Sequence, residues 1–281
     1  MICSGIAPSC PSRNGPPEIM RIIFIGDVVG STGRKALLRA VSHWRAQLSP
    51  DLLIVNGENA ASGRGITMPL AAEFFDGGVD VITLGDHVWD QRDLQDHIDE
   101  EPRLLRPFNF QSGTPGKGSL LVPTAEGPVG VLCLMGRTFM RVGAENPYTT
   151  GRAEAEALRR AGARAVLVDI HAESTSEKVG LGWHLDGVAS AVFGTHTHVQ
   201  TADARILPNG TAYMTDVGMC GSRNSVIGRD VESVLQSQVN SMPGKLEIGD
   251  WPALVSGALV DIDMATGRAT HLEPLNLILE K

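Results

Sequence analysis

The sequence predicts a layered α/β fold, in which helices cover both sides of a buried sheet within a single domain. The chain has 281 residues, of which 42% are hydrophobic and 20% charged, enough to enclose one large core. Its short apolar runs are rich in Val and Ile and lack a period-two alternation, as is typical of strands buried on both faces. Longer amphipathic stretches separate these runs, and this alternation indicates helices layered on a sheet.

Nine apolar runs are the expected strands, and four amphipathic stretches are the expected helices. The clearest helix covers residues 34–48, where Leu37, Leu38, Val41 and Trp44 recur on one face. The other helices are expected at residues 69–75, 92–98 and 152–161. The strands are expected at residues 22–25, 52–55, 79–84, 129–134, 165–168, 191–193, 212–214, 254–262 and 275–279.

Two segments stand apart from this pattern. Residues 1–19 are rich in Pro, Ser and Gly and are expected to be a disordered or non-native leader, which leaves residues 20–281 as the folded domain. Residues 221–250 are polar and Gly-rich with weak periodicity. They could form a cap or a contact surface between subunits, and the sequence leaves both interpretations open.

Composition excludes several classes of function. The net charge of −8 argues against a protein that coats long nucleic acid, although bound metal ions could still attract a small anionic substrate. Four cysteines without a CxxC pair suggest neither a disulfide scaffold nor a zinc ribbon. No apolar run approaches the roughly 20 residues of a membrane helix, and no secretory signal is evident. We therefore expect a cytoplasmic protein without a membrane partner.

Side chains that commonly bind metals follow most of the expected strands. Asp27, Glu58 and Asp86 are 31 and 28 residues apart (27 to 58 and 58 to 86), about the length of a strand, a helix and a return. Ligands of open α/β sheets bind beyond the carboxyl ends of the strands, so these carboxylates should share one edge. The remaining candidates at strand ends are Asn59, His87, His171, His196 and His198.

Carboxylate and imidazole groups together suit Mn, Fe or Zn, and the absence of thiolate from the pattern argues against structural zinc. About five to seven such ligands exceed the needs of one ion, so two ions with a bridging carboxylate are indicated. Singly, an aspartate after a strand is more often a helix cap and a histidine more often a packing residue. Four of the eight histidines follow apolar runs beside these carboxylates, however, and this joint pattern favours a metal site.

Other nucleotide and catalytic motifs are weaker. Gly26, Gly30 and Gly33 follow the first expected strand, but Val28 stands where a dinucleotide-binding loop requires glycine. The chain also lacks a GxxxxGK[ST] phosphate loop and a GxSxG nucleophile elbow.

The series of strand-end residues resembles the calcineurin-like metallophosphoesterase superfamily. Within that superfamily, strings along residues 21–279 are similar to the YmdB-type 2',3'-cyclic nucleotide phosphodiesterases. These strings are IGDVVGSTGR, VNGENAASGRGIT, HVWD, RPFNF, TPGKG, GRTF, STSEK, LGW, GTHTHVQTAD and TDVGM.

The resemblance implies a four-layer α/β/β/α sandwich with a binuclear Fe or Mn centre, in a cytoplasmic homo-oligomer, either a dimer or a tetramer. It implies attack by a metal-bridging hydroxide on a 2',3'-cyclic nucleotide, which opens the ring to a 3'-nucleotide. His87 would be the general acid. Glu58 would bridge the ions, Asp27 and His198 would bind one, and the other would be bound by Asp86, His171 and His196, with Asn59 as a further ligand.

Two positions depart from the superfamily pattern. Val29 stands where most members have a histidine, so one ion would have one protein ligand fewer. Asp86 stands where the family usually has asparagine, and its added charge should hold a cation more tightly but make the metal pair a weaker electrophile.

Alternative functions remain open at this stage. The same metal site could serve a phosphomonoesterase or nucleotidase, and Asp86 makes a low-turnover nucleotide-binding regulatory protein plausible. Arg137 and Thr138 are candidate substrate-binding residues, together with residues 174–178 and 215–218, although each segment could equally be a structural turn.

Overall fold

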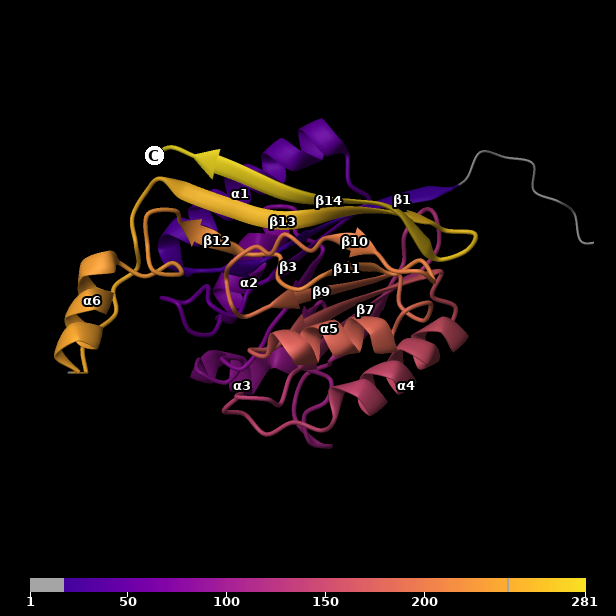
Figure 1. The fold of residues 1–281 in the computed structure, drawn as a ribbon, viewed down its shortest axis with the longest axis horizontal. Helices are drawn as coiled ribbons and strands as arrows, with labels where there is room; N and C mark the ends of the chain where they lie inside the picture. Colours follow the sequence, from indigo (N-terminus) through magenta and orange to yellow (C-terminus); the bar gives the residue numbers. More distant parts are fainter. Residues whose placement is uncertain (1–17, 242) are drawn as a thin grey trace, which may run out of the picture.

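The computed structural model describes residues 18–241 and 243–281, and within them two β-sheets pack face to face with helices on their outer sides (Figure 1). This is the four-layer α/β/β/α arrangement that the resemblance implies, in a single domain. Residues 1–17 of the expected leader lie outside the described residues. Ile19 begins the first strand and pairs with Asp263, so the sheet starts one residue before the expected domain boundary.

The strands of the first sheet are β1 (Ile19–Ile25), β2 (Asp27–Val28), β3 (Leu52–Asn56), β4 (Val81–Thr83), β5 (Leu104–Leu105), β12 (Met219–Ser222), β13 (Ala253–Asp263) and β14 (Arg268–Leu279). They run in the order β2-β12-β13-β1-β3-β4-β5, and β14 also pairs with β13. From β1 to β5 the neighbours are parallel, whereas β13 is antiparallel to β1.

The second sheet contains β6 (Ser119–Val122), β7 (Val129–Met135), β8 (Ala165–His171), β9 (Ala191–Thr195), β10 (Arg205–Ile206) and β11 (Ala212–Met214). Its order is β10-β11-β9-β8-β7-β6, and β7, β8, β9 and β11 are mutually parallel. β7 and β8 are buried along their whole length, which explains why their sequences are continuously apolar rather than alternating.

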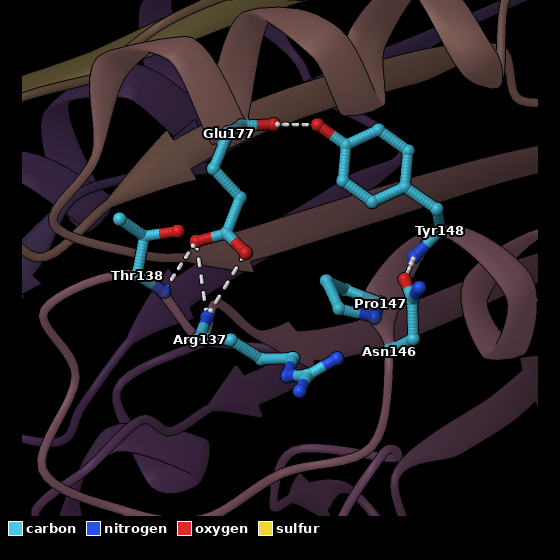
Figure 2. Close-up of a pocket in the computed structure, with 6 residues that line it drawn as sticks. All are labelled: Arg137, Thr138, Asn146, Pro147, Tyr148 and Glu177. Carbon is cyan, nitrogen blue, oxygen red and sulfur yellow. Dashed lines mark hydrogen bonds between the residues drawn. The ribbon is translucent and has the colours of Figure 1, made fainter.

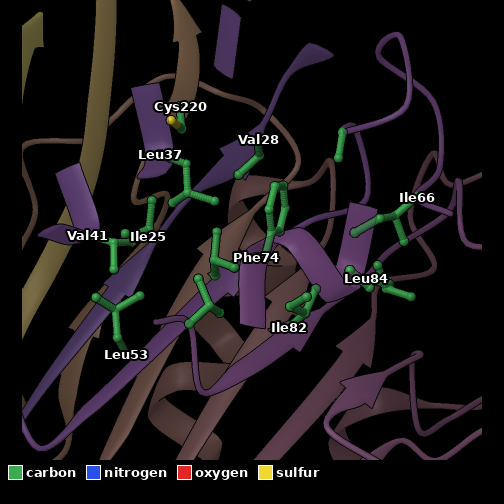
Figure 3. Close-up of a cluster of buried hydrophobic side chains, with 14 of the residues drawn as sticks. Ile25, Val28, Leu37, Val41, Leu53, Ile66, Phe74, Ile82, Leu84 and Cys220 are labelled. Atoms are coloured by element: carbon green, nitrogen blue, oxygen red, sulfur yellow. The ribbon is translucent and has the colours of Figure 1, made fainter. Parts of the chain in front are cut away.

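Apolar side chains form three clusters, one for each contact between layers. Phe24 and Phe193, whose ring centroids are 5.6 Å apart, belong to the cluster between the two sheets. A second cluster joins the first sheet to α1 (Gly30–Leu48) and α2 (Met68–Asp76), where Leu37 and Phe74 are completely buried (Figure 3). The third joins the second sheet to α4 (Pro147–Arg160) and α5 (Thr175–His184).

The expected strands and helices are all present, although several bounds differ. The strand expected at 79–84 is ordered as β4 only over Val81–Thr83. The helix expected at 92–98 is α3 (Arg92–His97), and a 3-10 turn over Ile98–Glu100 continues it. α4 begins at Pro147 rather than at residue 152, because the Asn146 side chain caps it by accepting a hydrogen bond from the Tyr148 amide. The elements that the sequence did not predict are the helices α5 and α6 (Val231–Asn240) and the short strands β2, β5, β6, β10 and β12.

The segment 221–250 contains α6, which projects from one side of the molecule (Figure 1). Short bridges between Arg229 and both Val226 and Ile248 fold the flanking chain back on itself. Among the helices in the described part of the chain, none has the length and apolarity needed to cross a bilayer.

Candidate metal centre and cleft

The candidate ligands lie where strands of both sheets end. In the first sheet, Asp27 follows β1, Glu58 follows β3 and Asp86 follows β4; in the second, His171 ends β8 and His196 follows β9. Because the strands that precede these residues are parallel within each sheet, their carboxyl ends meet at one edge. The expectation drawn from their spacing, that distant residues share one site, agrees with this arrangement.

Four of the candidates form a compact cluster. Glu58, Asp86, His171 and His196 each offer a ligand atom, and these atoms all lie within 4.8 Å of one another. The His171 Nε2 atom is 3.0 Å from Glu58 Oε1, 3.2 Å from Asp86 Oδ1 and 3.0 Å from His196 Nδ1. These four groups are therefore close enough to bind one cation with small side-chain adjustments.

Asp27 and His198 lie beside this cluster. Asp27 Oδ1 is 3.7 Å from His198 Nε2 and 3.9 Å from His171 Nδ1, while Asp27 Oδ2 accepts a hydrogen bond from the His196 amide at 3.1 Å. The other ring nitrogen of His198 is 3.0 Å from the carbonyl oxygen of Ile227, which directs Nε2 towards Asp27. A second group of ligand atoms thus adjoins the first.

Asn59 and Gly85 complete the surroundings of Glu58. The Asn59 side chain donates a hydrogen bond of 3.0 Å to Glu58 Oε1, so in this structure it contacts the expected bridging carboxylate. Gly85 lies so close to the Glu58 carboxylate and the His171 ring that a Cβ atom there would overlap both. Glycine at this position lets the loop after β4 approach the ligands.

The chemistry of the donor set fits a divalent cation. Asp27, Glu58 and His171 are at most 1% exposed, and no lysine or arginine of the described chain forms a salt bridge with Asp27, Glu58 or Asp86. Asp27 Oδ1 is buried and has no hydrogen-bond partner within residues 18–241 and 243–281. Buried carboxylates without a counter-charge are costly, and metal coordination is one of the ways in which proteins compensate for them.

The clustered charges shift the pKa values of the ligands. Burial alone would lower the pKa of His171, but the carboxylates of Glu58, Asp86 and Asp27 raise it well above its ordinary value. Burial alone would raise the pKa of Glu58 and of Asp86, yet His171 draws both below their ordinary values. Burial keeps the pKa of Asp27 raised despite the nearby His198. The metal-free site therefore places a cationic imidazole where a metal ion would supply the positive charge.

A strained turn presents the last two histidines. His196 and His198 have φ values of 93° and 65°, which non-glycine residues rarely adopt. Thr197 between them is anchored by Asp216, whose Oδ2 accepts hydrogen bonds from the Thr197 amide at 3.1 Å and hydroxyl at 2.6 Å. Lys178, only 1% exposed, pairs with the same Oδ2 at 2.9 Å. Lys178 and Asp216, both within segments expected to face substrate, instead hold this turn.

A cleft of about 440 Å³ opens beside the cluster. His87 lies on its wall with its amide 3.2 Å from Glu58 Oε2 and its Nδ1 2.9 Å from Asp90 Oδ2. The pairing with Asp90 leaves the Nε2 atom of His87 for a ligand in the cleft. The cleft is lined by Val29, Glu58, Asn59, Gly63, Arg64, His87, Glu173, His196, Thr197, His198, Ile227, Arg229 and Leu246.

The segment 221–250 supplies part of this wall, in agreement with the cap interpretation. Arg229 donates hydrogen bonds to the carbonyl oxygens of Ser62, Gly63 and Leu246 and so joins the segment to the loop that follows β3. Burial lowers the pKa of Arg229, and the neighbouring charge of Arg64 lowers it further. Two cations therefore adjoin an otherwise acidic centre.

Several residues of the cleft were not found from the sequence. Asp90 follows His87 by three residues and could have been identified as its partner from that spacing. Glu173, whose Oε2 is 3.2 Å from His196 Nε2, and Arg64 and Arg229 lie in loops without a comparable signal.

Arg137 and Thr138, expected on the substrate side, do not line the cleft. They lie with Asn146, Tyr148 and Glu177 around a separate pocket of about 350 Å³ (Figure 2). The amides of Arg137 and Thr138 donate hydrogen bonds of 3.0–3.1 Å to the Glu177 carboxylate, so this loop is fixed by α5. The sequence could not show this, because Glu177 is about 40 residues away along the chain.

Comparisons with known proteins agree with this geometry. The chain is 44% identical over 255 residues to the 2',3'-cyclic-nucleotide 2'-phosphodiesterase of Bacillus subtilis (strain 168), covering 90% of this chain and 96% of that protein. A solved structure of a novel phosphatase from Mycoplasma pneumoniae superposes with a TM-score of 0.88 at 30% identity, covering 95% of this chain and 96% of that one. A hypothetical protein from Thermus thermophilus superposes with a TM-score of 0.86 at 37% identity, covering 93% and 100%. Because the sequence model of the YmdB-like proteins matches residues 23–275, nearly the whole described chain, the protein belongs to the YmdB-like family.

Proposed function

We propose that the protein is a metal-dependent phosphodiesterase that converts 2',3'-cyclic nucleotides to 3'-nucleotides. The observation that carries this proposal is the cluster of Glu58, Asp86, His171 and His196 beside a cleft on whose wall His87 lies. The name of the Bacillus relative supports the choice of substrate.

Two divalent ions, Fe or Mn, are the proposed cofactors. Asp27 and His198 would bind one ion, Asp86, His171 and His196 the other, and Glu58 would bridge them with Asn59 nearby. The unpartnered Asp27 Oδ1 and the acid-rich cluster support this assignment. When bound, such a metal pair supplies activation of water and neutralisation of charge on the phosphoryl oxygens.

His87 is the proposed general acid. Water adds to phosphorus as the bond to the ribose 2'-oxygen breaks, and His87 gives its proton to that leaving oxygen. The phosphate then remains on the 3'-oxygen, which yields the 3'-nucleotide. Asp90, 2.9 Å from His87 Nδ1, orients the ring so that Nε2 faces the reacting group.

Arg64 and the aliphatic side chains of Ile227 and Leu246 are the proposed substrate contacts. All three line the cleft, and Arg64 lies close enough to Arg229 to affect its pKa. Arg229 is already engaged by three carbonyl oxygens, which leaves Arg64 as the cation suited to an anionic part of the substrate. The aliphatic groups would pack against the nucleoside.

An assay on a mixed panel tests the function. Purified protein with added Mn²⁺ is incubated with 2',3'-cyclic AMP, 3',5'-cyclic AMP and 3'-AMP, and the products are identified by chromatography. We expect 3'-AMP from the first substrate, and abolition of the reaction by His171→Ala. Release of inorganic phosphate from 3'-AMP at a higher rate would instead identify a phosphomonoesterase or nucleotidase.

Asp86 favours a second candidate, a low-turnover regulatory protein that binds a nucleotide. Its carboxylate lies 3.2 Å from His171 Nε2 and 3.4 Å from His196 Nδ1, so it adds a negative charge to the ligand set. That charge would reduce the electrophilicity of a metal pair. Tight nucleotide binding without hydrolysis in Mn²⁺, Fe²⁺ and Zn²⁺ would favour this function, and Asp86→Asn would then be expected to raise turnover.

We further propose that the protein forms a homo-oligomer, a dimer or a tetramer, through α6. Val231, Leu235 and Val239 follow one another at intervals of four residues and are 41%, 49% and 77% exposed, which forms an apolar stripe on one helix face. Light scattering after size-exclusion chromatography should give a smaller mass for Leu235→Glu/Val239→Glu than for the wild type. Equal masses would exclude α6 as the contact.

The proposed compartment is the cytoplasm. Cys133 and Cys220 are both buried free thiols, which fits a reducing environment. Fractionation of cells that produce the protein would test this placement.

A further inference from the structure

The two ring nitrogens of His171 face different groups. Nε2 faces the metal cluster, where it is 3.0 Å from Glu58 Oε1 and 3.2 Å from Asp86 Oδ1. Nδ1 faces the opposite way, towards the Thr195 hydroxyl at 2.8 Å. A histidine can bind a metal ion through Nε2 only when the proton of its neutral ring is on Nδ1. The partner of Nδ1 therefore decides whether Nε2 is ready to bind.

The Thr195 hydroxyl has one proton, and its neighbours determine where that proton points. Asp169 Oδ1 lies 2.7 Å from Thr195 Oγ1, and Asp169 Oδ2 accepts hydrogen bonds from Asn56 Nδ2 at 3.0 Å and from Thr83 Oγ1 at 2.5 Å. An ionised carboxylate only accepts, so Thr195 donates its proton to Asp169. The Thr195 oxygen is then left as an acceptor for a proton on His171 Nδ1. Asn56 Nδ2 is also 3.5 Å from Nδ1, but its shorter hydrogen bond goes to Asp169.

This arrangement is buried and drawn from both sheets. Asp169 is 1% exposed, and Asn56, Thr83 and Thr195 are completely buried. Asn56 and Thr83 end β3 and β4 of the first sheet, whereas Asp169 and Thr195 belong to β8 and β9 of the second. Water has little access to replace any of these hydrogen bonds, so their direction is set by the protein alone.

We propose that Asp169 and Thr195 form a hydrogen-bonded relay that holds the proton of His171 on Nδ1 and directs its Nε2 towards the metal. Asp169 acts through Thr195 and is a positioning residue rather than a catalytic one. The inference rests on the proposed metal site. Groups that orient a metal-binding histidine typically contribute about 10- to 100-fold to metal affinity.

Two substitutions test the direction of the relay. Thr195→Val keeps the shape of the side chain but removes the hydroxyl. Asp169→Asn keeps the shape but lets the introduced amide donate to Thr195, while its oxygen still accepts from Asn56 and Thr83. The Thr195 proton would then turn towards His171 Nδ1 and favour the wrong tautomer for Nε2 binding.

Thr195→Ser and Thr83→Val are the matched controls. The first restores the hydroxyl, and the second removes an equally buried hydroxyl that contacts Asp169 but for which no contact with His171 is seen in the described chain. Mn²⁺ dissociation constants are measured by competition with a chelating dye on full-length protein. Thr195→Val and Asp169→Asn should bind about 10- to 100-fold more weakly than the wild type, and both controls within about threefold of it.

A spectroscopic measurement on the metal-free protein separates the relay from general loosening. The ¹H–¹⁵N signal of His171 Nδ1–H, assigned by its absence in His171→Gln, should be protected from exchange in the wild type and in Thr195→Ser but not in Thr195→Val. Equal Mn²⁺ affinities for Thr195→Val and Thr83→Val, or a protected signal in Thr195→Val, would overturn the relay while leaving the proposed function intact. A wild-type protein that binds no metal ion would overturn both.

Discussion

Replacement of His87 by glutamine should slow the opening of a cyclic nucleotide by about 10²- to 10³-fold. A general acid contributes about 10²- to 10⁴-fold, but the His87 side chain is 28% exposed, so water can partly replace it and the lower part of that range applies. At about 1.4 kcal/mol for each factor of ten, the loss corresponds to about 3–4 kcal/mol of transition-state stabilisation. Since the proton is needed only as the alkoxide leaves, kcat should fall and KM should change little.

The choice of leaving group makes this prediction specific. Nitrophenolate leaves without a proton, so bis(4-nitrophenyl) phosphate should be hydrolysed by His87→Gln at nearly the wild-type rate. His97→Gln is the matched control, because His97 pairs with Glu100 at 3.0 Å with the same three-residue spacing as His87 and Asp90 but does not line the cleft. Steady-state rates on both substrates are compared for the three proteins. An equal loss on both substrates would refute the role of His87 as an acid and point to a role in binding.

Three further predictions concern the metal site, its supporting ion pair and the substrate. Because the neighbouring carboxylates raise the pKa of His171 well above its ordinary value against the effect of burial, the metal-free site holds a proton that a metal ion must displace. Mn²⁺ affinity should therefore fall as the pH is lowered below that pKa, by up to about tenfold per pH unit for one displaced proton, whereas an affinity that is constant from pH 6 to pH 8 would contradict this. Lys178→Met leaves the completely buried Asp216 without its cation and should lower the free energy of unfolding by about 3 kcal/mol in urea titrations, the lower part of the usual range because three N–H and O–H donors still contact Asp216. Adding Asp216→Asn should recover part of that loss, and a double variant no more stable than Lys178→Met would show that the charge is not the cause. Arg64→Gln should raise KM for a cyclic nucleotide about tenfold with little change in kcat, and an unchanged KM would remove Arg64 from the substrate site.

The layered fold and the meeting of the ligands could be predicted from the sequence because both depend on local patterns. Buried parallel strands leave continuous apolar runs, and the residue that follows each run lies at a common edge. The resemblance to known phosphoesterases added the second sheet, which periodicity alone does not reveal. Asp27, Glu58 and Asp86 were identified in this way before any side-chain position was known.

The missed features depend on contacts between distant parts of the chain. α5 contains Gly180 and Gly182, which weaken its helical signal, and Gly182 is required because a Cβ there would overlap the ring of Tyr213. The path of the loop at Arg137 is set by the carboxylate of Glu177, and no short-range pattern encodes that contact. Arg64 reaches the cleft only because Arg229 draws its loop towards the segment 221–250.

The place of β13 in the first sheet has a consequence for biosynthesis. This strand, Ala253–Asp263, lies between β1 and β12, so the strand synthesised first borders one that is among the last to leave the ribosome. Until then, β1 offers an unpaired edge on the side away from β3, and such edges invite association with other chains. A nascent chain stopped before residue 253 would therefore be expected to need chaperone protection, even though every ligand of the metal centre has already been translated.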